Sequence, residues 1–388
     1  MINIAERLQD IQEYYFSKKL REIALLKAEG KDIINLGIGS PDMPPPQKAV
    51  NALNEAARHQ AAHGYQSYKG IPELRKAFCD WYENHYKVSL NPEAEVLPLM
   101  GSKEGITYIS NAYLNEGDEV LIPNPGYPAY AAATRIAGGV VKLYELKEEH
   151  GWLPDLKALQ DQDLSRVKIM WINYPHMPSG AKISRAKLKE LVDFSGRNGI
   201  LLCHDNPYSF ILNDVPLSIF SGEGIPEHVL ELNSLSKSHN MAGWRVGMVA
   251  GHRQHIENIL IAKSNVDSGM FLGIQKAAIE ALKMPHQWYD SLNQTYSARR
   301  SVVWKIMEEL KCSYSREQAG LFVWGRVGKD VEEVSNLVDV LLYKMGVFVT
   351  PGFIFGTNGN RYIRISLCSD LGQLEEALER IKGFNTSK

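Results

Sequence analysis

The chain lacks the features that mark disulfide-bonded, metal-binding and membrane-spanning proteins. It has 388 residues but only four cysteines, Cys79, Cys203, Cys312 and Cys368, and none belongs to a Cys-x-x-Cys pair. Neither a disulfide framework nor a zinc knuckle is indicated. The scattered cysteines favour a reducing, cytoplasmic compartment.

Long apolar runs and an excess of charge are missing as well. No segment approaches the roughly 18 consecutive apolar residues of a membrane span, and residues 1–7 contain no apolar signal core. Lys and Arg number 43 against 45 Asp and Glu, so no basic field attracts nucleic acid or an anionic membrane. His252 and His255 lie in a polar turn typical of solvated side chains, so no metal site is expected. We expect a soluble, untargeted protein that binds small molecules.

Short apolar segments alternate with amphipathic ones over most of the chain. This alternation predicts an α/β fold with a mainly parallel sheet covered by helices on both faces. The seven predicted strands are residues 95–100, 119–122, 139–144, 167–172, 199–203, 228–232 and 246–250.

The pattern changes after residue 285, where a long helix, residues 287–309, precedes short strands and two further helices. We expect a smaller α+β domain here, joined by an N-terminal helix within residues 4–29. The predicted organisation is a large domain of residues 41–285 and a small domain made of residues 1–40 with 286–388.

Polar residues follow the ends of several predicted strands. Ligands bind beyond the carboxyl ends of the strands in open α/β sheets, so these residues are the candidate site. They are Gly101 with Ser102, Tyr127, Asn173, Asp205 with Tyr208, and Ser234 and Ser236 with Lys237.

The segment from Ser234 to Gly247 is the most informative of these. Lys237 lies between two serines, and Arg245 follows eight positions later. A lysine held to form a Schiff base, next to hydroxyls and a guanidinium suited to a phosphate, matches pyridoxal 5'-phosphate, which carries both an aldehyde and a phosphate. The alternative is an ordinary loop lysine.

Two glycine turns leave more than one interpretation open. Gly37-x-Gly39 lacks the third glycine of a dinucleotide site, and three prolines follow Asp42, so a nicotinamide site is disfavoured. A turn between domains and a substrate loop both remain possible there. At Gly101–Ser102 a strand, turn and helix in succession indicate an anion site, or simply a helix cap by Ser102.

Taken together, these motifs resemble the class I/II aminotransferases, which are fold-type I pyridoxal-phosphate enzymes, and the resemblance covers essentially the whole chain. It implies that Lys237 forms the Schiff base and moves the substrate proton, that Asp205 pairs with the pyridine nitrogen, and that Tyr208 bonds the 3'-oxygen of the cofactor. It also implies that Tyr127 stacks on the ring.

The resemblance assigns the remaining site residues too. It implies that the phosphate is held by Gly101, Ser102, Lys103, Ser234, Ser236 and Arg245, and by Tyr65 of the neighbour in a homodimer. Arg364 is implied as the clamp for the substrate carboxylate, a task that suits its bidentate fork, with Ile38, Gly39 and Asn173 nearby.

One position departs from the family pattern. The family usually has a second asparagine, which contacts the 3'-oxygen and the substrate carboxylate, where this chain has Met177. A thioether is a weak acceptor and donates nothing. We hypothesise that Asn173 or His176 takes over the contact, or that the site works without it at an altered cofactor pKa.

The resemblance implies transamination between an L-amino acid and a 2-oxo acid by a ping-pong mechanism. A β-lyase acting on sulfur amino acids is the alternative, followed by a ligand-sensing regulator, which usually carries a DNA-binding module that is absent here. Residues 263–271 contain no arginine for a second carboxylate, which disfavours aspartate and leaves aromatic, aliphatic or diamino-acid donors. Two motifs look most like those of diaminopimelate or broad-range aminotransferases, an analogy only.

Overall fold

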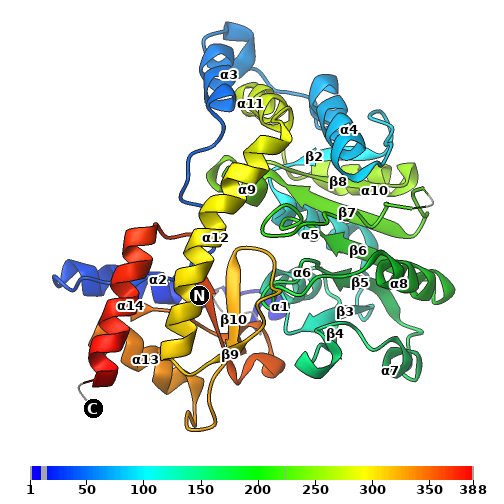
Figure 1. The fold of residues 1–388 in the computed structure, drawn as a ribbon. Helices are drawn as coiled ribbons and strands as arrows, with labels where there is room; N and C mark the ends of the chain where they lie inside the picture. Colours follow the sequence, from blue (N-terminus) through cyan, green and yellow to red (C-terminus); the bar gives the residue numbers. More distant parts are fainter. Residues whose placement is uncertain (1, 10–14, 223, 387–388) are drawn as a thin grey trace.

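A twisted seven-stranded sheet forms the centre of the larger part of the molecule (Figure 1). The structure is a computed structural model, and it describes residues 2–9, 15–222 and 224–386. The strand order is β2-β8-β7-β6-β5-β3-β4, and only β8 runs antiparallel to its neighbours. The bounds are β2 Val96–Leu99, β3 Glu119–Asn124, β4 Val140–Glu145, β5 Val167–Ile172, β6 Leu201–Asp205, β7 Val229–Ser234 and β8 Gly247–Gly251. The predicted mainly parallel sheet is confirmed.

Helices cover both faces of this sheet because its central strands are apolar on both sides. Along β5, Ile169 and Trp171 pack on one face, and Met170 and Ile172 on the other. The first face is covered by α5 Ser102–Tyr113, α6 Pro128–Ile136 and α10 Arg253–Ser264. The second face is covered by α4 Pro72–Tyr86 and α8 Arg185–Arg197. The remaining helices of this part are α3 Gln47–Ala57, α7 Leu156–Gln160, α9 Leu235–Ser238 and α11 Leu272–Leu282.

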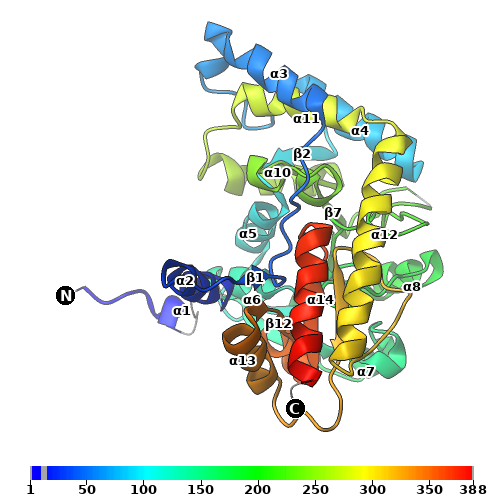
Figure 2. The same ribbon diagram turned by 60° about the vertical axis from the view of Figure 1, so that its left-hand side comes forward.

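The smaller part combines segments from the two ends of the chain. Strand β1, Ile34–Asn35, pairs in parallel with β11, Val347–Phe348. A second sheet has the order β12-β13-β10-β9, and α12 and α14 lie side by side next to it (Figure 2). The bounds are α1 Glu6–Gln9, α2 Tyr15–Ala28, α12 His286–Glu309, β9 Ser313–Tyr314, β10 Phe322–Arg326, α13 Val334–Met345, β12 Thr350–Pro351, β13 Tyr362–Ser366 and α14 Leu371–Thr386.

The segment between β1 and α3 runs from the smaller part to the α3–α11 pair (Figure 2). Asp42 in this segment accepts two hydrogen bonds from Arg299 of α12, at 2.6 and 2.7 Å. Arg299 is 5% exposed and also donates to the Leu367 carbonyl at 3.0 Å. This half-buried bidentate pair fixes the course of the segment close to Gly39.

Two local predictions differ from the structure. The helix expected within residues 4–29 appears as α1 and α2, and Ile11 lies outside the described residues. The alternative of an ordinary loop lysine at position 237 does not hold either, because Lys237 lies on a short helix that is capped where the Ser234 hydroxyl accepts a hydrogen bond from the Ser236 N–H. His252 and His255 lie at the start of α10 instead of in a turn.

The helices and the cysteines of the described residues bear on two expectations, that the chain does not span a membrane and that it forms no disulfide framework. In that part of the chain, no helix combines the length and the apolar character needed to cross a membrane. All four cysteines are buried and carry free thiols.

Candidate active site

A cavity of about 300 Å³ lies where the carboxyl ends of the central strands face the smaller part of the molecule. Its lining comes from segments that are more than three hundred residues apart in the sequence. The predicted site residues that line it are Ile38, Gly39, Ser102, Lys103, Tyr127, Asn173, Asp205, Tyr208, Ser234, Ser236, Lys237, Arg245 and Arg364.

Lys237 reaches into the cavity from α9. Its Nζ donates a hydrogen bond to the carbonyl of Gly39. A Cβ at position 39 would lie 2.2 Å from Phe322 Cζ, so the close packing of the Phe322 ring against residue 39 requires glycine. Burial lowers the pKa of the Lys237 ammonium below its ordinary value. A lysine that loses its proton readily is suited to act as a nucleophile and as a base.

Asp205 ends β6 with its side chain buried at the floor of the cavity. Oδ2 accepts a hydrogen bond from the Tyr130 hydroxyl at 2.9 Å, whereas the buried Oδ1 accepts none from residues 2–9, 15–222 and 224–386. Burial raises the pKa of Asp205 to about 6. Because buried acceptors are normally hydrogen-bonded, Asp205 Oδ1 is suited to accept a hydrogen bond from a ligand bound in the cavity.

One end of the cavity is built for an anion. Helix α5 begins with Ser102 and Lys103, and its N-terminus carries partial positive charge. The Ser234 and Ser236 hydroxyls lie 2.8 Å apart, and Arg245 lines the same cavity. Gly101 has φ 89°, and a Cβ there would lie 2.2 Å from Arg245 Nη2, so glycine is needed to admit the guanidinium.

Arg364, on β13, also lines the cavity. Its Cζ lies 3.8 Å from the ring centroid of Phe322, 4.6 Å from that of Phe355 and 5.5 Å from that of Phe16. Nη1 donates to Met177 Sδ at 3.2 Å and Nη2 to the Gly37 carbonyl at 3.0 Å. Aromatic faces, a thioether and a backbone carbonyl thus all contact the guanidinium.

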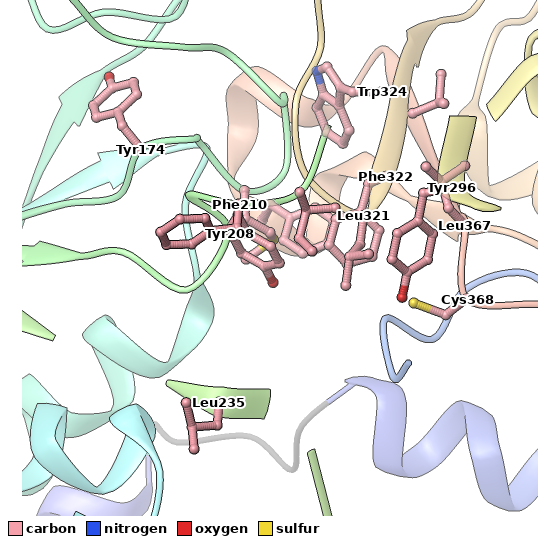
Figure 3. Close-up of a cluster of buried hydrophobic side chains, with 14 of the residues drawn as sticks. Tyr174, Tyr208, Phe210, Leu235, Tyr296, Leu321, Phe322, Trp324, Leu367 and Cys368 are labelled. Carbon is pink, nitrogen blue, oxygen red and sulfur yellow. The ribbon is translucent and has the colours of Figure 1, made fainter. Parts of the chain in front are cut away.

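Tyr208 lines the cavity and lies edge-on to Phe322, with ring centroids 6.1 Å apart (Figure 3). Burial raises the pKa of the Tyr208 phenol above its ordinary value. The hydroxyl therefore stays protonated at neutral pH and can donate a hydrogen bond into the cavity.

The residues next to Met177 have defined partners. Asn173 donates from Nδ2 to the Asp205 carbonyl, and its Oδ1 accepts from the Met177 N–H at 2.8 Å. His176 does not line the cavity, because its ring nitrogens face Ser179 Oγ at 2.7 Å and the Pro125 carbonyl at 3.2 Å. Of the two replacements considered for the missing asparagine, only Asn173 reaches the cavity, and both ends of its amide already have partners.

Two predicted residues lie outside the lining. Tyr65 is 92% exposed on the loop before α4, away from the cavity of its own chain. Gly101 adjoins the cavity through its contact with Arg245 without lining it.

Sequence reasoning missed four aromatic residues that line the cavity, Phe16, Tyr130, Phe322 and Phe355. Tyr130 follows Tyr127 by three positions at the start of a helix, a spacing that places both on one face. That signal was available for Tyr130. The three phenylalanines come from separate segments with no shared motif.

Pyridoxal 5'-phosphate fits this set of residues. The unpartnered Oδ1 of Asp205 suits a protonated ring nitrogen, and the cradle of α5, the two serines and Arg245 suits a phosphate. Lys237 lies in the same cavity and suits the aldehyde. No residue of the lining contradicts the assignment.

Comparisons with known proteins agree with this geometry. A family model described as aminotransferase class I and II matches residues 31–381. The LL-diaminopimelate aminotransferase of Desulforudis audaxviator is 40% identical over 381 residues, covering 98% of this chain and 97% of the relative. That of Halothermothrix orenii is 40% identical over 382 residues, covering 97% of each chain. Among solved structures, apo-BacF from Bacillus subtilis is 34% identical with a TM-score of 0.95, covering 99% of both chains.

Proposed function

The chain belongs to the class I and II aminotransferases, enzymes that depend on pyridoxal 5'-phosphate, and on that premise we propose that Lys237, Asp205 and Tyr208 are its catalytic residues. The enzyme moves an amino group between an L-amino acid and a 2-oxo acid in a ping-pong cycle. The observation that carries the proposed assignment is the meeting of Lys237, Asp205 and Arg364 in one cavity. The named relatives are aminotransferases. The comparisons therefore favour transamination over the β-lyase and regulatory alternatives.

When bound, pyridoxal 5'-phosphate supplies an aldehyde that takes up the amino group and an electron-poor ring that stabilises negative charge at the substrate α-carbon. Lys237 would hold the cofactor through its Nζ and would carry the proton at the substrate α-carbon. Asp205 would keep the ring nitrogen protonated through Oδ1. Tyr208 would donate from its hydroxyl to the 3'-oxygen, and Tyr127 would pack against the ring.

Arg364 is proposed to bind the substrate α-carboxylate. Phe322 and Phe355 hold the guanidinium plane in place, so less side-chain freedom is lost when the carboxylate binds. Ile38, Gly39 and Asn173 are proposed to line the substrate position. The phosphate is assigned to Gly101, Ser102, Lys103, Ser234, Ser236 and Arg245.

We propose a cytoplasmic homodimer in which Tyr65 reaches the phosphate of the neighbouring subunit. The 92% exposure of the Tyr65 side chain supports this, because an exposed tyrosine away from its own cavity is available to a second copy.

The four buried free thiols support a reducing compartment. The proposed domain division at residues 41 and 285 is supported by the pairing of β1 with β11.

The amino donor is proposed to carry an uncharged aromatic or aliphatic side chain. Phe16, Ile38, Phe322 and Phe355 are apolar, and the charged residues of the described lining are all assigned above to the cofactor or the α-carboxylate. A distal charge on the donor would lack a partner in this lining. LL-diaminopimelate, named for the relatives, is the second candidate because of their identity to this chain.

A donor panel of L-phenylalanine, L-leucine, LL-diaminopimelate and L-aspartate tests this, read as single-turnover conversion of the bound cofactor to its amino form. We expect L-phenylalanine and L-leucine to exceed L-aspartate by about tenfold or more in kcat/KM, because a buried charge without a partner is costly. A preference for LL-diaminopimelate would overturn the donor proposal in favour of the activity named for the relatives. Absence of turnover with all four donors would contradict the assigned site.

A further inference from the structure

Tyr130 of α6 is a buried tyrosine that touches the proposed catalytic carboxylate. Its side chain has no exposed surface, and its hydroxyl lies 2.9 Å from Asp205 Oδ2. The other carboxylate oxygen, Oδ1, has no hydrogen-bond partner within the described residues. The two oxygens of Asp205 are therefore in different environments, one held by the protein and one left to the cavity.

The direction of the Tyr130 hydroxyl is fixed by its ring. The ring stacks on Trp171 of β5 with centroids 4.9 Å apart and an interplanar angle of 6°. It also meets the ring of Tyr127 edge-on at 5.6 Å. Because Tyr127 is the N-cap residue of α6 and Tyr130 lies in its first turn, the start of one helix positions both the proposed ring-stacking residue and the partner of Asp205.

We propose that Tyr130 is a positioning residue whose phenol holds Asp205 Oδ2 and so presents Oδ1, ionised, to the ring nitrogen of the cofactor. This inference rests on the role assigned to Asp205 in the proposed function. Tyr130 acts through the carboxylate and takes no part in proton transfer at the substrate.

The charges around Asp205 explain why a donor is needed there. Burial raises the pKa of Asp205, while the hydrogen bond from Tyr130 and the nearby His204 and Lys237 act in the opposite direction. Burial and the Asp205 charge raise the pKa of Tyr130 well above its ordinary value, so the phenol remains a donor at every working pH. Without that donor, a larger fraction of Asp205 is protonated near neutral pH, and a protonated carboxyl cannot hold a charged ring nitrogen.

The test is the variant Tyr130→Phe, which keeps the stacked ring and removes only the hydroxyl. Tyr144→Phe is the matched control, because Tyr144 is equally buried and its hydroxyl donates to the Trp171 carbonyl at 2.7 Å, outside the cavity. Both variants lose one buried hydrogen bond. Only the first loses a contact to Asp205.

Three readouts on purified protein separate positioning from a structural role. For Tyr130→Phe we expect affinity of the apoprotein for pyridoxal 5'-phosphate to fall about tenfold or more, since a hydrogen bond to a charged group is lost. The acid limb of that affinity should move to higher pH, and kcat should fall with little change in KM. Tyr144→Phe should match the wild type in all three.

Equal cofactor affinity and equal acid limbs in Tyr130→Phe and Tyr144→Phe would overturn the inference. Asp205→Asn distinguishes this failure from failure of the proposed function. If Asp205→Asn weakens cofactor binding and Tyr130→Phe does not, only the positioning role is wrong; if neither does, the role of Asp205 itself is wrong. The double variant should bind the cofactor no more weakly than Asp205→Asn alone, because Tyr130 acts through that carboxylate.

Discussion

Replacement of Met177 by asparagine is expected to strengthen binding of the substrate carboxylate. The Met177 thioether now accepts a hydrogen bond from Arg364 Nη1 at 3.2 Å and offers no donor to the cavity. An asparagine side chain at this position can accept from Nη1 through its oxygen and donate from its amide nitrogen to a bound carboxylate.

The size of the effect follows from the kind of hydrogen bond gained. A hydrogen bond to a charged group contributes about 1.5–3 kcal/mol net, which corresponds to about tenfold to a hundredfold in affinity. Met177 is 6% exposed, so the smaller asparagine should also cost about 2 kcal/mol of folding stability through the space it leaves. The two effects are separable because one is measured by ligand binding and the other by denaturation.

The assay is titration of the cofactor-loaded enzyme with 3-phenylpropionate, a carboxylate that cannot react, together with the KM for L-phenylalanine. Met177→Asn should lower the Kd for 3-phenylpropionate and the KM for L-phenylalanine, each by about tenfold or more. Met177→Leu is the control, since it conserves volume and supplies neither acceptor nor donor, and it should bind the inhibitor like the wild type. If Met177→Asn and Met177→Leu bind 3-phenylpropionate equally, the side chain at position 177 does not affect carboxylate binding.

Three further predictions concern Lys237, Asp205 and the ion pair between Asp42 and Arg299. Lys237→Ala should bind pyridoxal 5'-phosphate without a covalent link, and mass spectrometry after borohydride treatment should find no cofactor attached to the chain; attachment elsewhere would refute the assignment. Because burial raises the folded-state pKa of Asp205 to about 6, apoprotein stability falls by about 3 kcal/mol in total as pH rises from the unfolded-state pKa of about 4 through the folded-state pKa. Asp205→Asn does not suffer this loss, so its stability advantage over the wild type should grow by about 1–1.5 kcal/mol between pH ~5 and ~7. Urea denaturation that gives the same difference at both pH values would contradict this. Asp42→Asn leaves the buried guanidinium of Arg299 without its carboxylate partner and should cost about 2–3 kcal/mol, which is below the roughly 3–5 kcal/mol for a fully buried pair because the Asp42 side chain is 32% exposed. Asp80→Asn, in the exposed pair with Lys76, should cost less than about 1 kcal/mol in the same denaturation experiment.

The parallel sheet was predictable because its signal is local. Strands such as β5 and β6 lie in mostly apolar runs flanked by polar turns, and a buried parallel strand favours that composition. The clustering of Lys237, Asp205 and Tyr208 followed from the rule that strand ends of a parallel sheet share one edge. Both inferences depend on short stretches of sequence.

The contacts of individual side chains were not predictable in the same way. Tyr127 and Tyr130 are chemically alike and lie in one helical turn, and only the packing of α6 on Trp171 decides which of them reaches Asp205. The three rings around Arg364 come from α2, β10 and the turn after β12, so no spacing in the sequence connects them. Such contacts depend on tertiary distances, which sequence periodicity does not encode.

The pairing of β1 with β11 has a consequence for synthesis of the chain. The seven strands of the large sheet are complete once residue 251 has emerged from the ribosome, and Lys237 is then already part of the chain. Ile34 and Asn35, made much earlier, must wait for Val347 and Phe348 before they gain their partners. Because domains tend to fold in the order of synthesis, the nascent protein completes the strands on which its cofactor would rest well before Arg364, which reads the substrate, has been made.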